Sequence, residues 1–235
     1  MNNIEFRAEN KYLVSDSDLA VIAQRLSAVM QHDIHQVGNS YEIRSVYFDD
    51  YQNTCMEEND AGIDIRKKFR IRTYAPQLSV LNLEIKEKQH GLTKKTSCEL
   101  TKDELDCIYN DAMSLHFGNR SPLNQLLLQM RSRRMQPKVI IVYERTAFVH
   151  PSGNIRITFD RNIMASKVCG ALLDEHIPGL TPVLPINMHI LEVKYDEMLP
   201  DFIARQLEIA KLQQTAFSKY YLGRCAINGD FCHIL

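Results

Sequence analysis

The chain has 235 residues, of which 45% are hydrophobic and 24% charged, as in an ordinary soluble globular protein of one or two domains. The formal net charge of −1 favours no class of partner by itself. No run of eighteen apolar residues predicts a transmembrane helix, and the first ten residues, MNNIEFRAEN, lack the apolar core of a secretion signal. The six cysteines are scattered without a CxxC pair. We therefore expect a cytoplasmic protein with reduced thiols.

Alternation of apolar and polar residues predicts β-strands along most of the chain. The predicted strands cover residues 3–13, 41–49, 66–74, 80–89, 94–100, 138–149, 154–161 and 188–196. Helices are expected between them, at about 16–30, 101–110, 122–134 and 200–212. Asp16 or Ser17 would cap the first helix, Thr101 and Glu104 would form a capping box for the second, and Pro200 suits the first turn of the fourth.

Eight strands are enough to close a small barrel. Few helices in a strand-rich order favour an α+β fold with antiparallel strands over a parallel α/β fold. We predict a single domain over residues 1–235, an eight-stranded antiparallel β-barrel with helices packed outside.

The polar faces of the predicted strands are unusually rich in long charged side chains. At alternate positions they carry Glu5, Arg7, Glu9 and Lys11; Arg66, Lys68, Arg70 and Arg72; Glu84, Lys86 and Lys88; Lys95, Ser97 and Glu99; Tyr143 and Arg145; Arg156, Thr158 and Asp160; and Glu192 and Lys194. Each strand alone is typical of a solvated outer face. Because amphipathic helices are available to cover the apolar faces, the recurring pattern favours charged faces that point into the barrel.

A cationic lumen is costly unless an anion fills it, because like charges repel and lose water. Interleaved glutamates offset part of this cost, and a polyanion would offset the rest. Arginine binds phosphate oxygens through its planar fork, while lysine adds a point charge. A phosphate chain is favoured over nucleic acid, since aromatic stacking partners are sparse and the chain has no tryptophan.

Glutamates that face bound phosphate need a cation between the two negative groups. Mg²⁺ or Mn²⁺ is typically held by a few carboxylates together with substrate phosphate oxygens. Glu192 is the first candidate ligand, followed by Glu5, Glu9 and Glu84. The alternative for each is an ion pair with a neighbouring Arg or Lys, and for Glu5 that alternative is favoured. Nucleotide-binding glycine motifs and an HExxH zinc motif are absent from the sequence.

Eight segments resemble, in family order, the VTC domain of polyphosphate polymerases, which belongs to the CYTH or triphosphate tunnel metalloenzyme superfamily. They are RAENKYLV, SVYFDD, FRIRTY, LEIKEK, YERTAF, IRITFD, LEVKYD and FSKYYLG, and they span residues 7–223. The opening Glu5-x-Arg7-x-Glu9-x-Lys11 is similar to the ExExK first strand of that superfamily. The resemblance implies an antiparallel tunnel that moves the γ-phosphoryl of ATP onto a growing polyphosphate and releases ADP.

The resemblance also implies roles for individual residues. The residues expected to hold the reacting phosphates are Lys11, Arg70, Arg72, Lys86, Arg145, Arg156 and Lys219. Further substrate-binding residues are expected at Arg7, Lys68, Lys88, Lys95, Tyr143, Lys194 and Ser218. Glu192 would hold the metal, with Glu9 and Glu84 as weaker candidates. The segment FSKYYLG implies a C-terminal helix that plugs or flanks the tunnel, although the residues alone suggest only a helix start.

Two positions depart from the family pattern. Arg7 replaces the middle Glu of the hydrolytic branch, which favours the polymerase-like branch. Ala216 stands where polymerases of this type carry a further basic residue. Two alternatives therefore stay open beside the polymerase: a hydrolase of tripolyphosphate or nucleoside triphosphates, and a non-catalytic module that binds polyphosphate or inositol phosphates. The family also implies a membrane-associated partner subunit, while the oligomeric state stays open.

Overall fold

The computed structural model describes residues 8–34, 36, 38–90, 92–208 and 212–230. Its strands are β1 (Ala8–Ser15), β2 (Gln31–His32), β3 (Tyr41–Asp49), β4 (Arg66–Tyr74), β5 (Leu81–Gln89), β6 (Leu92–Leu100), β7 (Gln136–His150), β8 (Ile155–Ser166), β9 (Thr181–Pro182) and β10 (Met188–Tyr195). The helices are α1 (Asp16–Ser27), α2 (Thr54–Asp60), α3 (Lys102–Asn110), α4 (Ser121–Arg133), α5 (Asp201–Leu207) and α6 (Lys219–Asn228), with 3₁₀ turns η1 (Ser152–Asn154) and η2 (Cys169–Leu173).

The strands follow the order β1-β10-β8-β7-β3-β4-β5-β6, with β2 on β7 and β9 on β8. The recorded registers of β1 with β10, β10 with β8, β3 with β4, β4 with β5 and β5 with β6 are all antiparallel. The prediction of an antiparallel α+β fold is confirmed. Contacts divide the chain into two compact units: residues 1–42, 143–163 and 184–217 form the first, and residues 43–142, 164–183 and 218–235 form the second.

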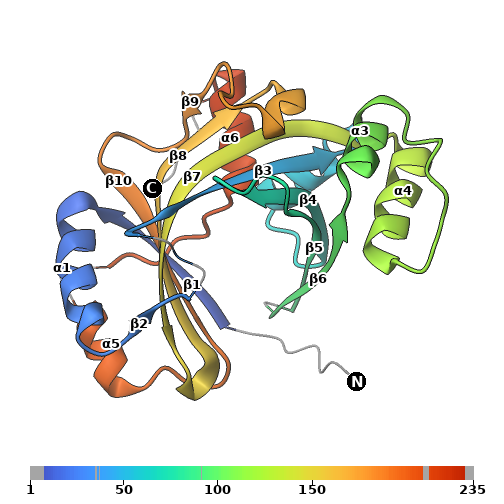
Figure 1. The fold of residues 1–235 in the computed structure, drawn as a ribbon. Coiled ribbons are helices and arrows are strands. Elements are labelled where there is room, and N and C mark those ends of the chain that lie inside the picture. Colours follow the sequence, from blue (N-terminus) through green and yellow to red (C-terminus); the bar gives the residue numbers. More distant parts are fainter. Residues whose placement is uncertain (1–7, 35, 37, 91, 209–211, 231–235) are drawn as a thin grey trace. The chain divides into compact units, whose positions relative to one another are not determined.

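In the first unit, α1 and α5 lie side by side against the apolar face of the strands (Figure 1). Leu19, Ile22 and Leu26 of α1 are buried in one core cluster with Ile157 of β8 and Val193 of β10. Since side chains alternate along a strand, the charged residues of β8 and β10 point away from these helices. Within this unit, the charged residues therefore lie on the strand face opposite the helices.

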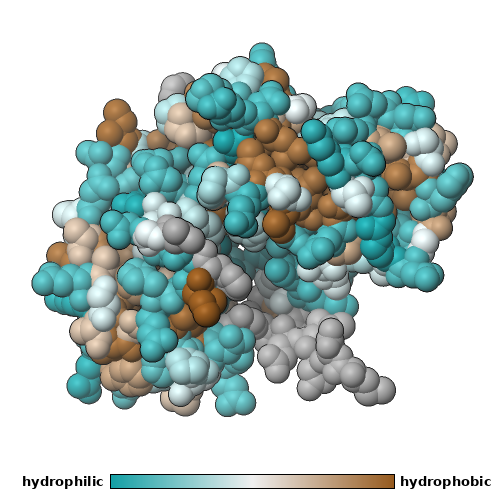
Figure 2. Space-filling view, in the orientation of Figure 1, coloured by the Kyte–Doolittle hydropathy of each residue, from teal (hydrophilic) through white to brown (hydrophobic). Residues whose placement is uncertain are grey.

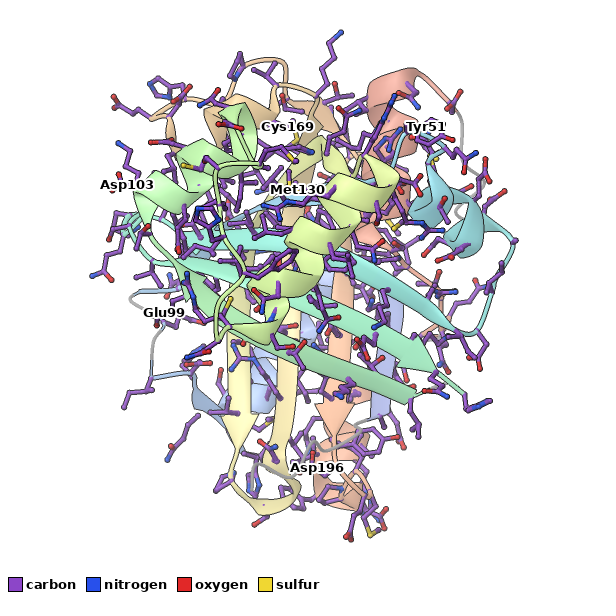
Figure 3. All side chains as sticks on the ribbon, turned by 90° about the vertical axis from the view of Figure 1, so that its right-hand side faces the viewer. Tyr51, Glu99, Asp103, Met130, Cys169 and Asp196 are labelled. Atoms are coloured by element: carbon purple, nitrogen blue, oxygen red, sulfur yellow. The ribbon has the colours of Figure 1, made fainter. Side chains whose placement is uncertain are left out.

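In the second unit, α4 packs across β5 and β6, as Figure 3 shows with Met130 on the helix and Glu99 near the end of β6. Leu83 and Ile85 of β5 and Leu126 and Leu127 of α4 are fully buried. Around α4, hydrophobic side chains also reach the surface between hydrophilic ones (Figure 2). The polar residues of β4 and β5 again take the opposite face of the strands.

The structure corrects several local predictions. Ser15 caps α1 instead of Asp16 or Ser17, because its hydroxyl accepts from the Asp18 backbone while the Asp18 carboxylate accepts from Ser15. The first predicted helix, α1, ends at Ser27 and not at about residue 30. The fourth predicted helix, which is α5, begins after Pro200 and ends at Leu207. Helix α2 was not predicted.

The expectation of reduced thiols holds for four cysteines of the described residues and is wrong for a fifth. Cys55, Cys98, Cys107 and Cys169 are free thiols, whereas Cys225 of α6 is disulfide-bonded. Among the described residues, none of the helices has the length and apolar character needed to cross a membrane.

Candidate functional site

The first charged cluster lies on the polar face of the first unit and forms two cross-strand rows. One row runs from Lys11 on β1 through Glu192 on β10 to Thr158 on β8, and the next runs from Glu9 through Lys194 to Arg156. Opposite residues of antiparallel strands lie about 5 Å apart at Cβ, so each row forms one continuous strip of side chains.

Lys11 is fixed by two contacts within the first unit. Its ammonium lies 3.0 Å from Oε1 of Glu9 and donates a 2.9 Å hydrogen bond to the carbonyl of Phe217. The carboxylate of Glu9, a weaker metal candidate, is thus engaged by a lysine. Glu5 and Arg7, the first two charged residues of the predicted strand, lie outside the described residues.

Arg145 of β7 is the most deeply held cation of this cluster. Its Nε and Nη2 donate to the two oxygens of Asp160 at 2.6 and 2.7 Å, and Nη2 lies 3.9 Å from Oε2 of Glu192. Burial alone would lower the pKa of Arg145, but Asp160, Tyr143 and Glu192 together outweigh burial and hold that pKa well above its ordinary value. The ring of Tyr143 lies 5.3 Å below the guanidinium, which supports the cation through its π face.

Arg156 has two partners in the first unit that the sequence did not indicate. Its guanidinium forms an ion pair with the buried carboxylate of Asp33 and donates to the phenol of Tyr41 at 3.3 Å. Lys194 forms an ion pair with Glu192 on its own strand. Each predicted cation of this face that the structure describes therefore has a carboxylate beside it, which sets its position.

The second charged cluster lies on β3 to β6 of the second unit, around Glu84. Arg70 donates to Glu84 at 2.7 Å through Nε and pairs at 2.6 Å through Nη2, Lys95 lies 3.2 Å away, and Arg72 lies 3.8 Å away. Glu84 is only 3% exposed. Burial would raise its pKa, yet Arg70 and Arg72 outweigh burial and hold the pKa well below its usual range.

Three lysines stand directly opposite one another beside this carboxylate. The register pairs Lys68 of β4 with Lys86 of β5, and Lys86 with Lys95 of β6. Lys88 stands one row further along, opposite Arg66. Like charges directly opposite each other across strands are destabilising, so this row is suited to an anionic ligand.

Lys68 connects this row to the start of α6 in the second unit. Its ammonium donates to Oδ1 of Asn59 at 2.5 Å and to Oγ of Ser218 at 2.8 Å, and it lies 5.9 Å from the ring of Tyr220. Ser218 caps the helix by accepting from the Tyr221 backbone at 3.3 Å. The structure thus brings Ser218 and Lys68, two predicted binding residues, into direct contact.

Tyr47 belongs to this cluster although it was not among the predicted site residues. It lies opposite Arg70 on β3, and its phenol accepts a 3.0 Å hydrogen bond from Arg70. Burial would raise its pKa, but the charges of Arg70, Arg72 and Lys219 together lower it. The motif SVYFDD contains Tyr47, yet nothing in the sequence alone marks its partner.

A divalent metal fits the first cluster only if a bound substrate supplies some of its ligands. Among the described residues, no group of three or more His, Cys, Asp or Glu side chains could hold a metal ion. Glu192, 4% exposed, offers one carboxylate, opposite the buried hydroxyl of Thr158. One carboxylate together with substrate oxygens suits Mg²⁺ or Mn²⁺.

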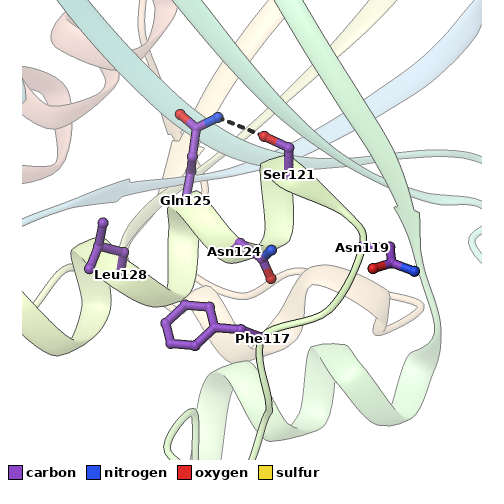
Figure 4. A pocket seen from close by; sticks show the side chains of 6 residues that line it. All are labelled: Phe117, Asn119, Ser121, Asn124, Gln125 and Leu128. Carbon is purple, nitrogen blue, oxygen red and sulfur yellow. Dashed lines mark hydrogen bonds between the residues drawn. The ribbon is translucent and has the colours of Figure 1, made fainter.

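A hollow beside α4 is unrelated to these clusters. Its lining, drawn in Figure 4, consists of Phe117, Asn119, Ser121, Asn124, Gln125 and Leu128. A 3.3 Å hydrogen bond joins Gln125 to Ser121, and the lining has no charged side chain. It therefore offers a phosphate chain no cation.

Comparison with solved structures shows which fold the chain has. A Hippeastrum protein described as an adenylyl cyclase candidate with a dominant triphosphatase activity is 13% identical, with 98% of each chain covered and a TM-score of 0.54. An adenylate cyclase candidate from Bacillus halodurans is 16% identical over 81% of this chain and 80% of its own, with a TM-score of 0.49. A Pyrococcus horikoshii protein is 12% identical over 94% and 99%, with a TM-score of 0.49. The fold is that of the triphosphate tunnel proteins.

The family follows from the sequence comparison. The model of the VTC domain family matches residues 6–228, nearly the whole length, and the chain belongs to this family. The search of curated proteins gave no match. Membership in this family supports a function that concerns polyphosphate or triphosphate.

Proposed function

We propose that the protein is a metal-dependent polyphosphate polymerase that transfers the γ-phosphoryl group of ATP onto a growing polyphosphate in the basic tunnel of its fold. The observation that carries the proposal is the row of Lys68, Lys86 and Lys95, next to Arg70 and Arg72. One carboxylate, Glu84, lies within 4.0 Å of Arg70, Arg72 and Lys95. A chain of phosphates would bring negative charge to this row of cations.

The reaction requires positioning and charge stabilisation more than covalent chemistry. Phosphoryl transfer spreads negative charge over the equatorial oxygens of the moving group, and fixed cations stabilise that charge without reorganising. Arg145 suits this role because Asp160 holds its guanidinium by two hydrogen bonds. Arg156 is similarly oriented by Asp33. Such oriented arginines are worth more in a buried site than in water.

Glu192 is the residue proposed to hold the metal, with Glu9 as a second candidate. A bound Mn²⁺ or Mg²⁺ would neutralise charge on the phosphate oxygens. Glu84 is less suited, because three cations, Arg70, Arg72 and Lys95, already surround its carboxylate. The substrates proposed are ATP and inorganic polyphosphate, and a membrane-associated subunit is the proposed partner.

A hydrolase of tripolyphosphate or nucleoside triphosphates is the second candidate. It is supported by the dominant triphosphatase activity described for the similar Hippeastrum protein. Ala216 in place of a further basic residue also removes a feature of the polymerases. In the hydrolase, water would replace the growing chain as acceptor at the same site.

One assay separates these functions. Purified protein is incubated with ATP and Mn²⁺ or with tripolyphosphate and Mn²⁺, and products are resolved by gel and by phosphate release. Chain growth with equimolar ADP supports the polymerase, whereas orthophosphate from tripolyphosphate supports the hydrolase. Arg70→Ala and Glu192→Ala should abolish either activity.

Arg120→Ala is the matched control, because Arg120 is an exposed arginine paired with Glu104 outside both clusters. It should behave as wild type. Binding of polyphosphate with neither product would contradict both enzymes and leave a binding module.

A further inference from the structure

Thr158 of β8 carries a buried hydroxyl that the protein itself does not use. The residue is 2% exposed, and its Oγ1 has no hydrogen-bond partner in the described part of the chain. A buried hydroxyl without a partner has lost its water without compensation, which costs stability. Such a group calls for an explanation in a folded protein.

The two other threonines of the described residues that are almost fully buried have partners within the protein. Thr73 donates to the carbonyl of Leu78 at 3.0 Å, and Thr146 donates to the carbonyl of Asn39 at 2.8 Å. Valine has nearly the same shape as threonine and would fill the position of Thr158 without a desolvated polar atom. Packing alone therefore does not account for the hydroxyl.

The hydroxyl belongs to the first charged cluster by its register. Thr158 lies in the row that begins with Lys11 and passes through Glu192, and it shares a strand face with Arg156 and Asp160. Glu192 does not take up the hydroxyl, since its oxygens are directed to Lys194 and Arg145. The Thr158 hydroxyl is therefore available to a ligand bound beside Glu192.

We propose that Thr158 is a ligand-binding residue, whose hydroxyl donates a hydrogen bond to a phosphate oxygen of the chain bound beside Glu192. The inference rests on the proposed function in so far as the ligand is a phosphate chain. A neutral donor suits this place, because it binds an anionic oxygen without adding to the repulsion among the neighbouring cations. It also brings no charge that would compete with a metal at Glu192.

The test is Thr158→Val, with binding of tripolyphosphate in the presence of Mn²⁺ measured by calorimetry and unfolding measured by thermal melting. The variant should raise the Kd about tenfold, because it loses one hydrogen bond to a charged group. Its Tm should stay or rise, since a desolvated hydroxyl is replaced by a methyl group. Thr158→Ser keeps the donor and should restore most of the affinity.

Thr146→Val is the matched control with the opposite signature. It removes a satisfied hydrogen bond to Asn39, so its Tm should fall while its Kd stays that of wild type. An unchanged Kd in Thr158→Val, or a weaker Kd that Thr158→Ser does not rescue, overturns the inference.

The outcomes for the inference and for the proposed function can be told apart. Normal chain growth with an unchanged Kd in Thr158→Val would overturn the inference alone. A Kd change without chain growth in wild type would overturn the polymerase alone. Wild-type protein that does not bind tripolyphosphate would overturn both.

Discussion

The phenol of Tyr220 donates a hydrogen bond to the buried carboxylate of Asp49, and the same phenol oxygen accepts one from Arg224 at 3.0 Å. Asp49 also accepts from the backbone of Cys55 and Met56 at 2.9 and 3.1 Å, in the first turn of α2. Burial, and then the charge of Asp49, raise the pKa of Tyr220, so the phenol stays a donor at neutral pH. Helix α6 is thereby tied to α2 and to the end of β3.

Tyr220→Phe should destabilise the protein by about 1–3 kcal/mol, because Asp49 loses a donor and Arg224 loses an acceptor in a buried place. Denaturant unfolding measures the change. Tyr221→Phe is the control on the same helix, since it removes a 2.5 Å bond from a phenol to the carboxylate of Asp60 at the surface. Equal losses in the two variants would contradict an anchoring role for Tyr220.

Glu84→Gln should destabilise the ligand-free protein by about 3 kcal/mol, because Arg70 and Arg72 would lose their shared buried counter-charge. Added tripolyphosphate should recover much of the loss in Tm, since it would supply negative charge to the same cations. Glu87→Gln is the control, because Glu87 pairs with the half-exposed Lys67 at 2.7 Å and should cost less than about 1 kcal/mol. A loss in Glu84→Gln that phosphate does not relieve would speak against a phosphate ligand at this cluster.

The depressed pKa of Glu84 predicts a dependence of stability on pH. The unfolded carboxyl takes up a proton near its ordinary pKa of about 4.3, whereas the folded carboxylate, held by Arg70, does so only at lower pH. The unfolded state therefore binds more protons in that range, and stability falls as the pH drops below the ordinary pKa. Unfolding free energies measured between neutral and acid pH should show a shallower fall in Glu84→Gln than in wild type.

Gly223→Ala should destabilise the protein by about 1–3 kcal/mol through overpacking. A Cβ at this position of α6 would lie 2.2 Å from Cδ1 of the buried Ile141 and 3.4 Å from Cβ of Ala165. Ile141→Val removes the clashing methyl and should relieve part of the loss in the double variant. Gly170→Ala, where nothing lies within 4 Å, should change stability by no more than about 0.5 kcal/mol. A double variant no better than Gly223→Ala would argue against this clash.

The strands were predictable because each has one face covered by helices and one charged face. Such a strand must alternate apolar and charged residues. The predicted strands at 41–49 and 66–74 have the same bounds as β3 and β4 in the structure. Helix α2 was not predicted from the sequence. Its N-cap residue, Asn53, has a left-handed backbone and makes no capping hydrogen bond with its side chain. Short helices of this kind are set by tertiary contacts, which a local pattern does not contain.

Site partners were harder to predict than site cations. The arginines and lysines stand out by spacing, whereas Asp33, which pairs with Arg156, is 123 residues away in sequence. The contact of Tyr47 with Arg70 and the role proposed for Thr158 were not predicted for the same reason, because the surroundings of a hydroxyl depend on the neighbouring strand. Register decides these pairings, and register follows from the folded sheet.

The contacts of Lys11 have a consequence for how substrate preference could change. Beside the ammonium bond to Phe217, the backbone of Thr215 donates to the Lys11 carbonyl at 2.9 Å, and Tyr12 forms a bridge with Gln214. The position of the Lys11 ammonium is therefore set by residues 214–217, which carry no charged side chain. A change in the length of residues 214–217 would therefore move the Lys11 ammonium without any substitution of the lysine. In the proposed tunnel, such a change would alter where Lys11 meets a phosphate chain.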